Sequence, residues 1–381
     1  MVAAQTTVPT DVAHSTESAS AASAPLPTPS MTGPLTLPPA NYFSAGPLGK
    51  LALNGVLSGL AVWQDNPTPQ DSGGRVDISN AQIFFQKTTG IVQFYLQAGA
   101  YNLPSLGFPF LSTASIVGDY FGPIPVVYVK FAPKGDFSLE LGKLPAPLGA
   151  ESTFTFQNMN IERGLIWNQE NDVSRGMQLN YSKGRFSSSL SWNDGFYSNR
   201  FNWLTGSATY AINAADSLQV VAGGNLGRTG YSGVVTPLFQ NNSQIYDLIY
   251  THTLGKWIIQ PYFQYTRVPT DLKIGVTRTT STQGEALLTS YHLSKNLFLP
   301  IRVAYISSSG NSKDGSINLL YGPGSGAGSL TITPTYQKKG FFTRAEFSFV
   351  PLTDPTPGDG FGTHGRNNSQ VRGMVETGFM F

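Results

Sequence analysis

The feature that most constrains this chain is a two-residue alternation of apolar and polar side chains that recurs from about residue 49 to the end. In one example, Trp257, Ile259 and Phe263 share one face, and Gln260 and Gln264 share the other. Successive side chains of a β-strand point to opposite faces, so this period predicts strands with one apolar face and one polar face. We count sixteen such segments, near residues 49–63, 76–87, 91–101, 123–132, 136–144, 174–183, 185–193, 201–213, 217–226, 243–253, 256–266, 282–293, 296–307, 327–337, 340–350 and 370–381.

The connections between these segments alternate strictly between short and long. Short turns such as 183–184 and 254–255 are followed by Gly-, Pro- and Asn-rich stretches, of which the longest spans 145–173. An even number of strands joined in this way is typical of an antiparallel up-and-down β-barrel. In membrane barrels the short turns lie on the periplasmic side, so we expect both ends of the chain there.

The composition excludes several other classes. Charged residues make up 12% of the chain, whereas soluble domains contain about 25%. No apolar run approaches the roughly 18 residues of a transmembrane helix. The absence of cysteine removes disulfide scaffolds and thiolate sites, and a net charge of +2 gives no reason to expect nucleic acid. The alternative is a soluble all-β sandwich or propeller, but sixteen strands would then need a very large core.

Aromatic residues gather beside the short turns, as they do at membrane–water interfaces. We therefore predict an all-β, transmembrane antiparallel barrel of about sixteen strands in the outer membrane of a Gram-negative bacterium. The aromatic residues in this row are Phe85, Phe131, Phe137, Tyr181, Phe186, Tyr210, Trp257, Tyr291, Tyr336, Phe341 and Phe381.

Residues 1–45 differ from the rest of the chain. They are rich in Ala, Ser, Thr and Pro, and they show no hydrophobic period. Such a stretch buries too little apolar area to offset its chain entropy, so we predict a disordered periplasmic extension preceding a barrel of residues 46–381. It has neither the basic start nor the apolar core of a signal peptide, and we expect that any export signal has been removed.

Several short motifs resemble those of the OmpL-like β-barrel porins of bacterial outer membranes. They are Gly142-Lys143 at a strand end, Gly149 two residues before Glu151, Asn158 with Asn160 downstream, and Gly176 followed by Tyr181. The stretch 331–347 is similar to the closing hairpin of the same family, and the likeness covers roughly residues 48–381. It implies an outer-membrane pore without indicating a solute.

Charged residues within the strands fall on the polar face. Charge on the lipid face costs about 2–4 kcal/mol for Arg or Lys at the bilayer midplane, so a barrel should turn these residues inward. They could line a pore or pair across strands, as Arg344 with Glu376. With the charges of the longest connection, the candidate pore-lining or constriction residues are Lys130, Glu140, Glu151, Glu162, Arg163, Arg302, Arg344, Glu346, Arg372 and Glu376.

The connection 145–173 is too long and too apolar for a simple solvated loop. Its apolar side chains need a surface to cover, and the inner wall of the barrel is the nearest. We predict that it folds inward and sets the constriction, with Glu162 and Arg163 at the narrowest point and Glu170 and Arg175 also bringing charge toward the channel. The alternative is that it packs on the outer rim or against a neighbouring protomer.

The sequence shows no catalytic, cofactor or metal motif. The four histidines have no ligand spacing, and sparse aspartates such as Asp354 and Asp359 are more often turn residues than Ca²⁺ ligands. An enzyme, such as a lipase using His252 or His292, ranks third among the functions. The first is passive diffusion of small hydrophilic solutes, sugars included. The second is a surface adhesin or scaffold that acts through its outer loops.

The expected partners follow from an outer-membrane barrel. They are membrane lipid and lipopolysaccharide, small polar solutes, and the barrel-assembly machinery, which would read the last strand ending in Phe381. A homotrimer is compatible with sixteen strands, although no sequence feature decides it.

Overall fold

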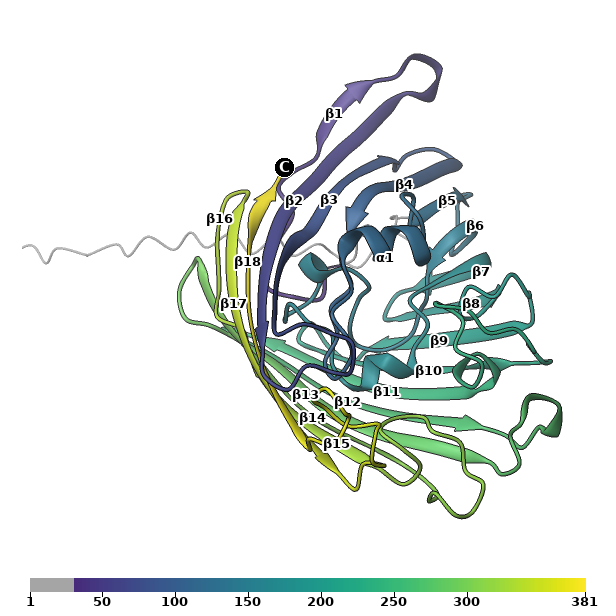
Figure 1. Cartoon of the computed structure of the whole chain (residues 1–381). Helices are drawn as coiled ribbons and strands as arrows, with labels where there is room; N and C mark the ends of the chain where they lie inside the picture. The colour runs from purple at the N-terminus through teal and green to yellow at the C-terminus, as the bar shows by residue number, and fades with distance from the viewer. Residues whose placement is uncertain (1–30) are drawn as a thin grey trace, which may run out of the picture.

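The structure, a computed structural model, describes residues 31–381. Its 18 strands form one antiparallel sheet that closes on itself, because β18 (Ser369–Met380) pairs with β2 (Lys50–Gln64) (Figure 1). The other strands are β1 (Asn41–Ser44), β3 (Gly74–Lys87), β4 (Val92–Tyr101), β5 (Val126–Phe131), β6 (Phe137–Pro145), β7 (Val173–Lys183), β8 (Phe186–Asn193), β9 (Trp203–Ala211), β10 (Asp216–Asn225), β11 (Gln244–Leu254), β12 (Trp257–Val268), β13 (Thr280–His292), β14 (Leu297–Ser308), β15 (Gly326–Ile332), β16 (Thr335–Lys338) and β17 (Phe341–Thr353).

The closed barrel has sixteen strands, as the sequence predicts. β15 and β16 form one barrel strand, since both pair with β14 and with β17. They are separated at Pro334, which has no N–H to donate to a sheet. β1 is additional, and it pairs with residues 50–53 of β2 beyond the end of β18.

The alternation seen in the sequence becomes the two faces of the wall. On β7, Leu179 is 44% exposed on the outside while its neighbour Gln178 is 6% exposed inside. Aromatic rings near the short turns contact one another around the outside, as Trp257 and Tyr291 do with ring centroids 4.5 Å apart. This arrangement agrees with the interfacial girdle predicted from the sequence.

Two long connections fold into the barrel instead of out of it (Figure 1). The first lies between β4 and β5 and carries the helix α1 (Thr113–Asp119). The second lies between β6 and β7 and carries the 3-10 turns η2 (Thr155–Gln157) and η3 (Ile166–Gln169). They contact each other, since Leu106 N–H donates to the Arg163 carbonyl and Arg163 N–H donates to the Pro104 carbonyl, at 3.0 and 3.1 Å.

Three further 3-10 turns lie outside these connections, η1 (Gly46–Leu48), η4 (Gln240–Asn242) and η5 (Leu272–Ile274). In the described part of the chain, no helix has the length and hydrophobicity that crossing a bilayer requires.

The prediction of disorder at the N-terminus is wrong for residues 31–45; the remainder of that prediction, residues 1–30, lies outside the described residues. Residues 41–44 form β1, and Leu35 is fully buried inside the barrel. The prediction assumed that so polar a segment has no surface to pack against, whereas the barrel itself supplies one.

Candidate functional site

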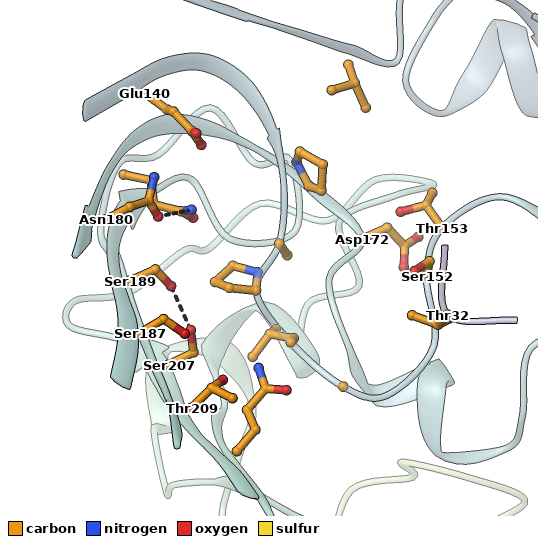
Figure 2. A pocket seen from close by; sticks show the side chains of 18 of the residues that line it. Thr32, Glu140, Ser152, Thr153, Asp172, Asn180, Ser187, Ser189, Ser207 and Thr209 are labelled. Carbon is orange, nitrogen blue, oxygen red and sulfur yellow. Dashed lines mark hydrogen bonds between the residues drawn. The ribbon is translucent and has the colours of Figure 1, made fainter. Parts of the chain in front are cut away.

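A cavity of about 590 Å³ inside the barrel, called here the larger cavity, lies along the inner faces of β4 to β10. Figure 2 shows wall residues such as Asn180, Ser189 and Ser207 across the cavity from Thr153 and Asp172 of the β6–β7 connection. The wall is lined mainly by neutral hydrogen-bonding groups, and the hydroxyls of Ser189 and Ser207 lie 2.7 Å apart. Residues beside the short turns also line it, so the cavity reaches that end of the barrel.

A second cavity of about 300 Å³ lies toward the long loops. Its lining comes from both inward connections and from the connection between β10 and β11, including Phe108, Tyr120, Val234 and Pro237. The two cavities therefore occupy opposite ends of the barrel interior.

Four residues line both cavities, namely Trp167, Glu170, Asn171 and Asp172. All four belong to the β6–β7 connection, immediately before β7 begins at Val173. This short stretch is the place where the two cavities adjoin.

The two carboxyl groups at this junction are held toward their neutral forms. Burial, and secondarily the nearby Asp247, raises the pKa of Glu170, which also accepts hydrogen bonds from Tyr262 and Gln264 at 2.7 and 3.0 Å. Burial raises the pKa of Asp172 to about 8, although Arg163 opposes the shift. At neutral pH the junction therefore presents little net negative charge.

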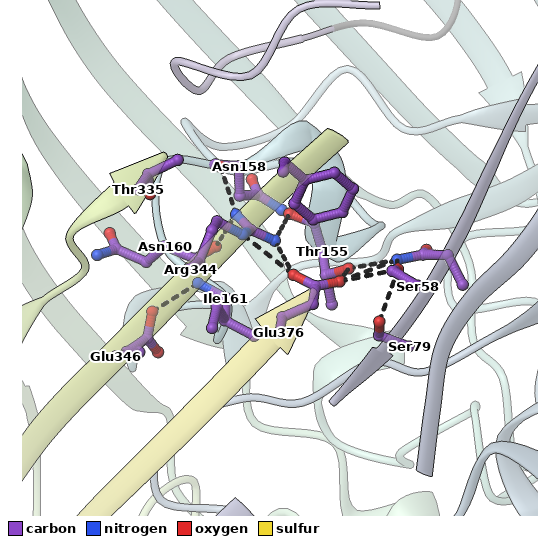
Figure 3. A network of polar contacts seen from close by, with 12 residues as sticks. Ser58, Ser79, Thr155, Asn158, Asn160, Ile161, Thr335, Arg344, Glu346 and Glu376 are labelled. Atoms are coloured by element: carbon purple, nitrogen blue, oxygen red, sulfur yellow. Dashed lines mark hydrogen bonds and ion pairs between the residues drawn. The ribbon is translucent and has the colours of Figure 1, made fainter. Parts of the chain in front are cut away.

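The β6–β7 connection is fixed to the barrel wall by buried charged side chains, of which Figure 3 shows Arg344, Glu346 and Glu376. Arg344 of β17 pairs with Glu376 of β18, its register partner, and donates to the carbonyls of Thr155 and Asn158 at 3.0 and 3.1 Å. Arg302 of β14 donates to Glu151 at 2.6 Å and to the Glu162 carbonyl at 2.7 Å.

Two more wall residues extend this set of contacts, which we call the wall clamp (Arg302, Arg344, Glu346, Arg372 and Glu376). Arg372 of β18 pairs with Glu162 and donates to the carbonyls of Ser105 and Phe108 at 3.1 and 2.9 Å. Glu346 of β17 accepts from the backbone N–H groups of Ile161 and Glu162. Buried charges are costly unless they are paired and hydrogen-bonded, so the clamp strongly favours the inward position of the connection.

Arg163 is held differently. It is fully buried, and its guanidinium nitrogens have no hydrogen-bond partner among the described residues. The group lies over the ring of Trp167, 5.1 Å from the centroid, and burial lowers its pKa to about 10. Arg163 thus supports the Trp167 side chain, which lines both cavities.

The structure separates the ten residues predicted to line the pore into two groups. Lys130, Glu140 and Glu151 border the larger cavity, where Lys130 and Glu140 pair across β5 and β6 at 3.2 Å. The other seven border neither cavity: the five clamp residues, Glu162 and Arg163 are each at most 4% exposed.

The predicted narrowest point at Glu162 and Arg163 does not agree with the positions of these two residues. Glu162 pairs with Arg372 in the wall, and Arg163 packs against the ring of Trp167. The junction residues were missed as a group. Their signal was the run 167–170, in which one tryptophan is followed by three polar residues near the end of the connection. Arg175, also predicted to bring charge toward the channel, pairs with Asp194 at 2.8 Å.

Within residues 31–381, no three His, Asp or Glu side chains come together as a metal site would need.

One family model matches residues 50–381 of the chain, and its description is "Putative beta-barrel porin-2, OmpL-like". A comparison with curated protein sequences found no match. The match confirms the family resemblance seen in the sequence motifs.

Solved outer-membrane proteins share the fold. The anion-selective porin from Comamonas acidovorans has a TM-score of 0.62 at 12% identity, over 87% of this chain and 99% of that one. The outer membrane channel DcaP of Acinetobacter baumannii has a TM-score of 0.58 at 10% identity, over 87% and 97%. OmpF of Salmonella typhi, in a complex with daunomycin, has a TM-score of 0.56 at 12% identity, over 87% and 98%. At such identities the likeness concerns the fold alone.

Proposed function

The chain belongs to the OmpL-like β-barrel porin family, and on that premise we propose that it lets small, uncharged hydrophilic solutes, sugars included, diffuse passively across the outer membrane. The membership and the sixteen-strand barrel make it an outer-membrane porin. The proposal adds the class of solute and the route, and it involves no catalytic step.

The observation that carries the proposal is the pair of cavities that adjoin at Trp167, Glu170, Asn171 and Asp172. One reaches the short-turn end of the barrel and the other reaches the loop end. We assign the narrowest part of the route to these four residues. This proposal retains the predicted constriction by the β6–β7 connection, but it assigns the narrowest point to the C-terminal part of that connection.

The choice of uncharged solutes rests on the chemistry of the lining. Tyr95 and Tyr128 stack with centroids 5.6 Å apart, and an aromatic surface suits the apolar face of a sugar ring. Hydroxyl and amide groups such as Ser207 and Asn180 can replace the hydrogen bonds that a solute makes to water. The charges of Lys130 and Glu140 offset each other, and the junction carboxyl groups are largely neutral.

Liposome swelling tests the solute class. Vesicles containing the protein should admit neutral sugars faster than sugar acids or amino sugars of similar size. Equal rates for neutral and charged solutes of one size would contradict the proposed preference, and no swelling with any of them would contradict the pore itself.

The position of the constriction is tested by removing the largest side chain at the junction. We expect Trp167→Ala to raise single-channel conductance, because Trp167 lines both cavities. Trp63→Ala is the matched control, since Trp63 is 60% exposed on the outer face of β2. If Trp167→Ala conducts like the parent while both variants fold, the narrowest point lies elsewhere.

The remaining partners belong to the same proposal. Lipid and lipopolysaccharide would cover the outer face, and the barrel-assembly machinery would bind the last strand with Phe381, whose ring fits over Gly55. Three barrels could assemble as a trimer, which native electrophoresis after crosslinking would reveal as a threefold mass.

A further inference from the structure

Residues 31–38 run inside the barrel without belonging to its wall. The carbonyl of Pro38 accepts from the Asn54 amide of β2 at 3.0 Å. Thr36 exchanges two hydrogen bonds with the Gln337 side chain of β16: its N–H donates at 2.9 Å and its carbonyl accepts at 2.7 Å. Asn54 and Gln337 are both buried on the inner face near the short turns, so the segment enters from that end.

The far end of the segment rests on the β6–β7 connection. The N–H groups of Thr32 and Gly33 both donate to the Gln157 carbonyl, at 2.8 and 2.9 Å. The approach is so close that a Cβ on Gly33 would lie 2.3 Å from the Asn158 carbonyl oxygen. Only glycine fits there without displacing the segment.

The middle of the segment packs into a buried apolar cluster on the inner face of the wall. Leu35 is 0% exposed and packs in one cluster with Val56, Phe84, Phe342 and Met380 of β2, β3, β17 and β18. We call these four residues the socket. The interior of a water-filled barrel is normally polar, and an empty socket would expose more of this apolar surface to water. Its presence on four adjacent strands indicates a surface built for a resident apolar group.

We propose that residues 31–38 are a built-in plug, which Leu35 holds in the socket. The docked plug narrows the short-turn half of the route, and release of the plug widens that half. Thr32 borders the larger cavity opposite the polar wall, as Figure 2 shows. The plug therefore occupies space that a solute could otherwise use.

The plug is held more weakly than the β6–β7 connection. It is held by neutral hydrogen bonds and by apolar contacts of the fully buried Leu35 and the partly buried Met31 and Leu37, whereas the wall clamp consists of buried ion pairs. Pro34 and Pro38 restrict the backbone before docking, which lowers the entropy lost on docking. The plug is thus the element of the interior that can be released while the constriction stays in place.

Cysteine labelling tests the docked position independently of conduction. The chain contains no cysteine, so Leu35→Cys and Pro39→Cys each introduce a single thiol. Pro39 is exposed and lies only four residues away. In the folded barrel, a water-soluble maleimide should label Leu35→Cys about tenfold or more slowly than Pro39→Cys. Equal labelling rates would overturn the proposal.

Conductance tests the effect of the plug on the route. Leu35→Asp places a charge in the socket and should raise single-channel conductance to roughly one and a half times the parent value or more. Pro39→Asp, with the same charge on an exposed position, should leave it unchanged. If Leu35→Asp folds poorly, Gly33→Val displaces the segment from Asn158 and should have the same effect.

The two readouts separate this inference from the proposed function. Parent-like conductance in folded Leu35→Asp and Gly33→Val would overturn the plug. If the parent conducts nothing, the porin proposal fails, and the labelling rates alone then sustain or overturn the docked segment.

Discussion

Arg344 and Glu376 show why single residues inside this barrel matter more for structure than for selectivity. Both are fully buried, and the pair also binds the backbone of the β6–β7 connection. The sequence left open whether these residues pair across strands or line the pore, and the geometry favours pairing. A polar residue on the inner face is therefore not automatically a pore residue.

The first prediction at the residue scale concerns this pair. Arg344→Leu should lower the free energy of unfolding by about 3–5 kcal/mol, because Glu376 is left buried without its partner. The double variant Arg344→Leu with Glu376→Leu should recover much of the loss. Urea unfolding in lipid vesicles gives the measurement.

The exposed pair Arg278 and Asp314, 3.1 Å apart, provides a control for that experiment. Arg278 is 60% exposed, so Arg278→Leu should cost less than about 1 kcal/mol. Equal losses for Arg278→Leu and Arg344→Leu would show that the clamp contributes no more than a surface pair.

The second prediction concerns Asp172, whose pKa burial raises to about 8. The carboxyl is mostly neutral below that pH and negative above it, so the preference for cations over anions should increase as the pH rises from 6.5 to 9.5. Reversal potentials in planar bilayers under a salt gradient report this preference. Asp172→Asn should lose most of the change, and a change of the same size in that variant would assign it to another group, such as Glu170.

At the scale of single elements, alternate residues of each strand face either the lipid or the barrel interior. The third prediction uses neighbours on β7. Leu179→Arg should destabilise the barrel by about 2–4 kcal/mol if the site is near the midplane, because Leu179 is exposed on the lipid face and lies between Leu139 and Leu190. Gln178→Arg should be tolerated, since Gln178 borders the larger cavity. Folding yields in vesicles would be compared, and equal yields would contradict the assignment of the two faces.

The elements themselves could be predicted well from the sequence. Every barrel strand overlaps a predicted segment and its ends differ by only a few residues, because the two-residue period is set by local geometry. β1 was missed, since the four residues Asn41–Ser44 follow a proline-rich stretch and gain their order by pairing with β2. The break at Pro334 was likewise absorbed into one predicted strand, 327–337.

At the scale of the whole molecule, the alternation of turn lengths predicts the orientation of the barrel in the membrane. The fourth prediction is that a membrane-impermeant maleimide added to intact cells labels Tyr231→Cys and spares Leu48→Cys. Both positions are more than half exposed, but Tyr231 lies in a long loop and Leu48 in the turn between β1 and β2. Labelling of Leu48→Cys from outside would reverse the topology.

The interior was the part that the sequence could not place. The sequence predicted that residues 145–173 fold inward, because their apolar side chains need a surface, but the residues it placed at the narrowest point, Glu162 and Arg163, border neither cavity. Whether an interior residue faces a cavity depends on partners far along the chain, such as Arg372 for Glu162 and Gln337 for Thr36. Contacts of this kind leave no local period to detect.

The wall clamp also has a consequence for the order of folding. Glu151 meets Arg302 across 151 positions of sequence, and Glu162 meets Arg372 across 210. Such distant partners come together only once β14 and β18 are in place, because the entropy cost of closing a long loop must be met before its contacts form. Membrane insertion and closure of the barrel should therefore come first, and the channel should acquire its final shape in a late, slower phase.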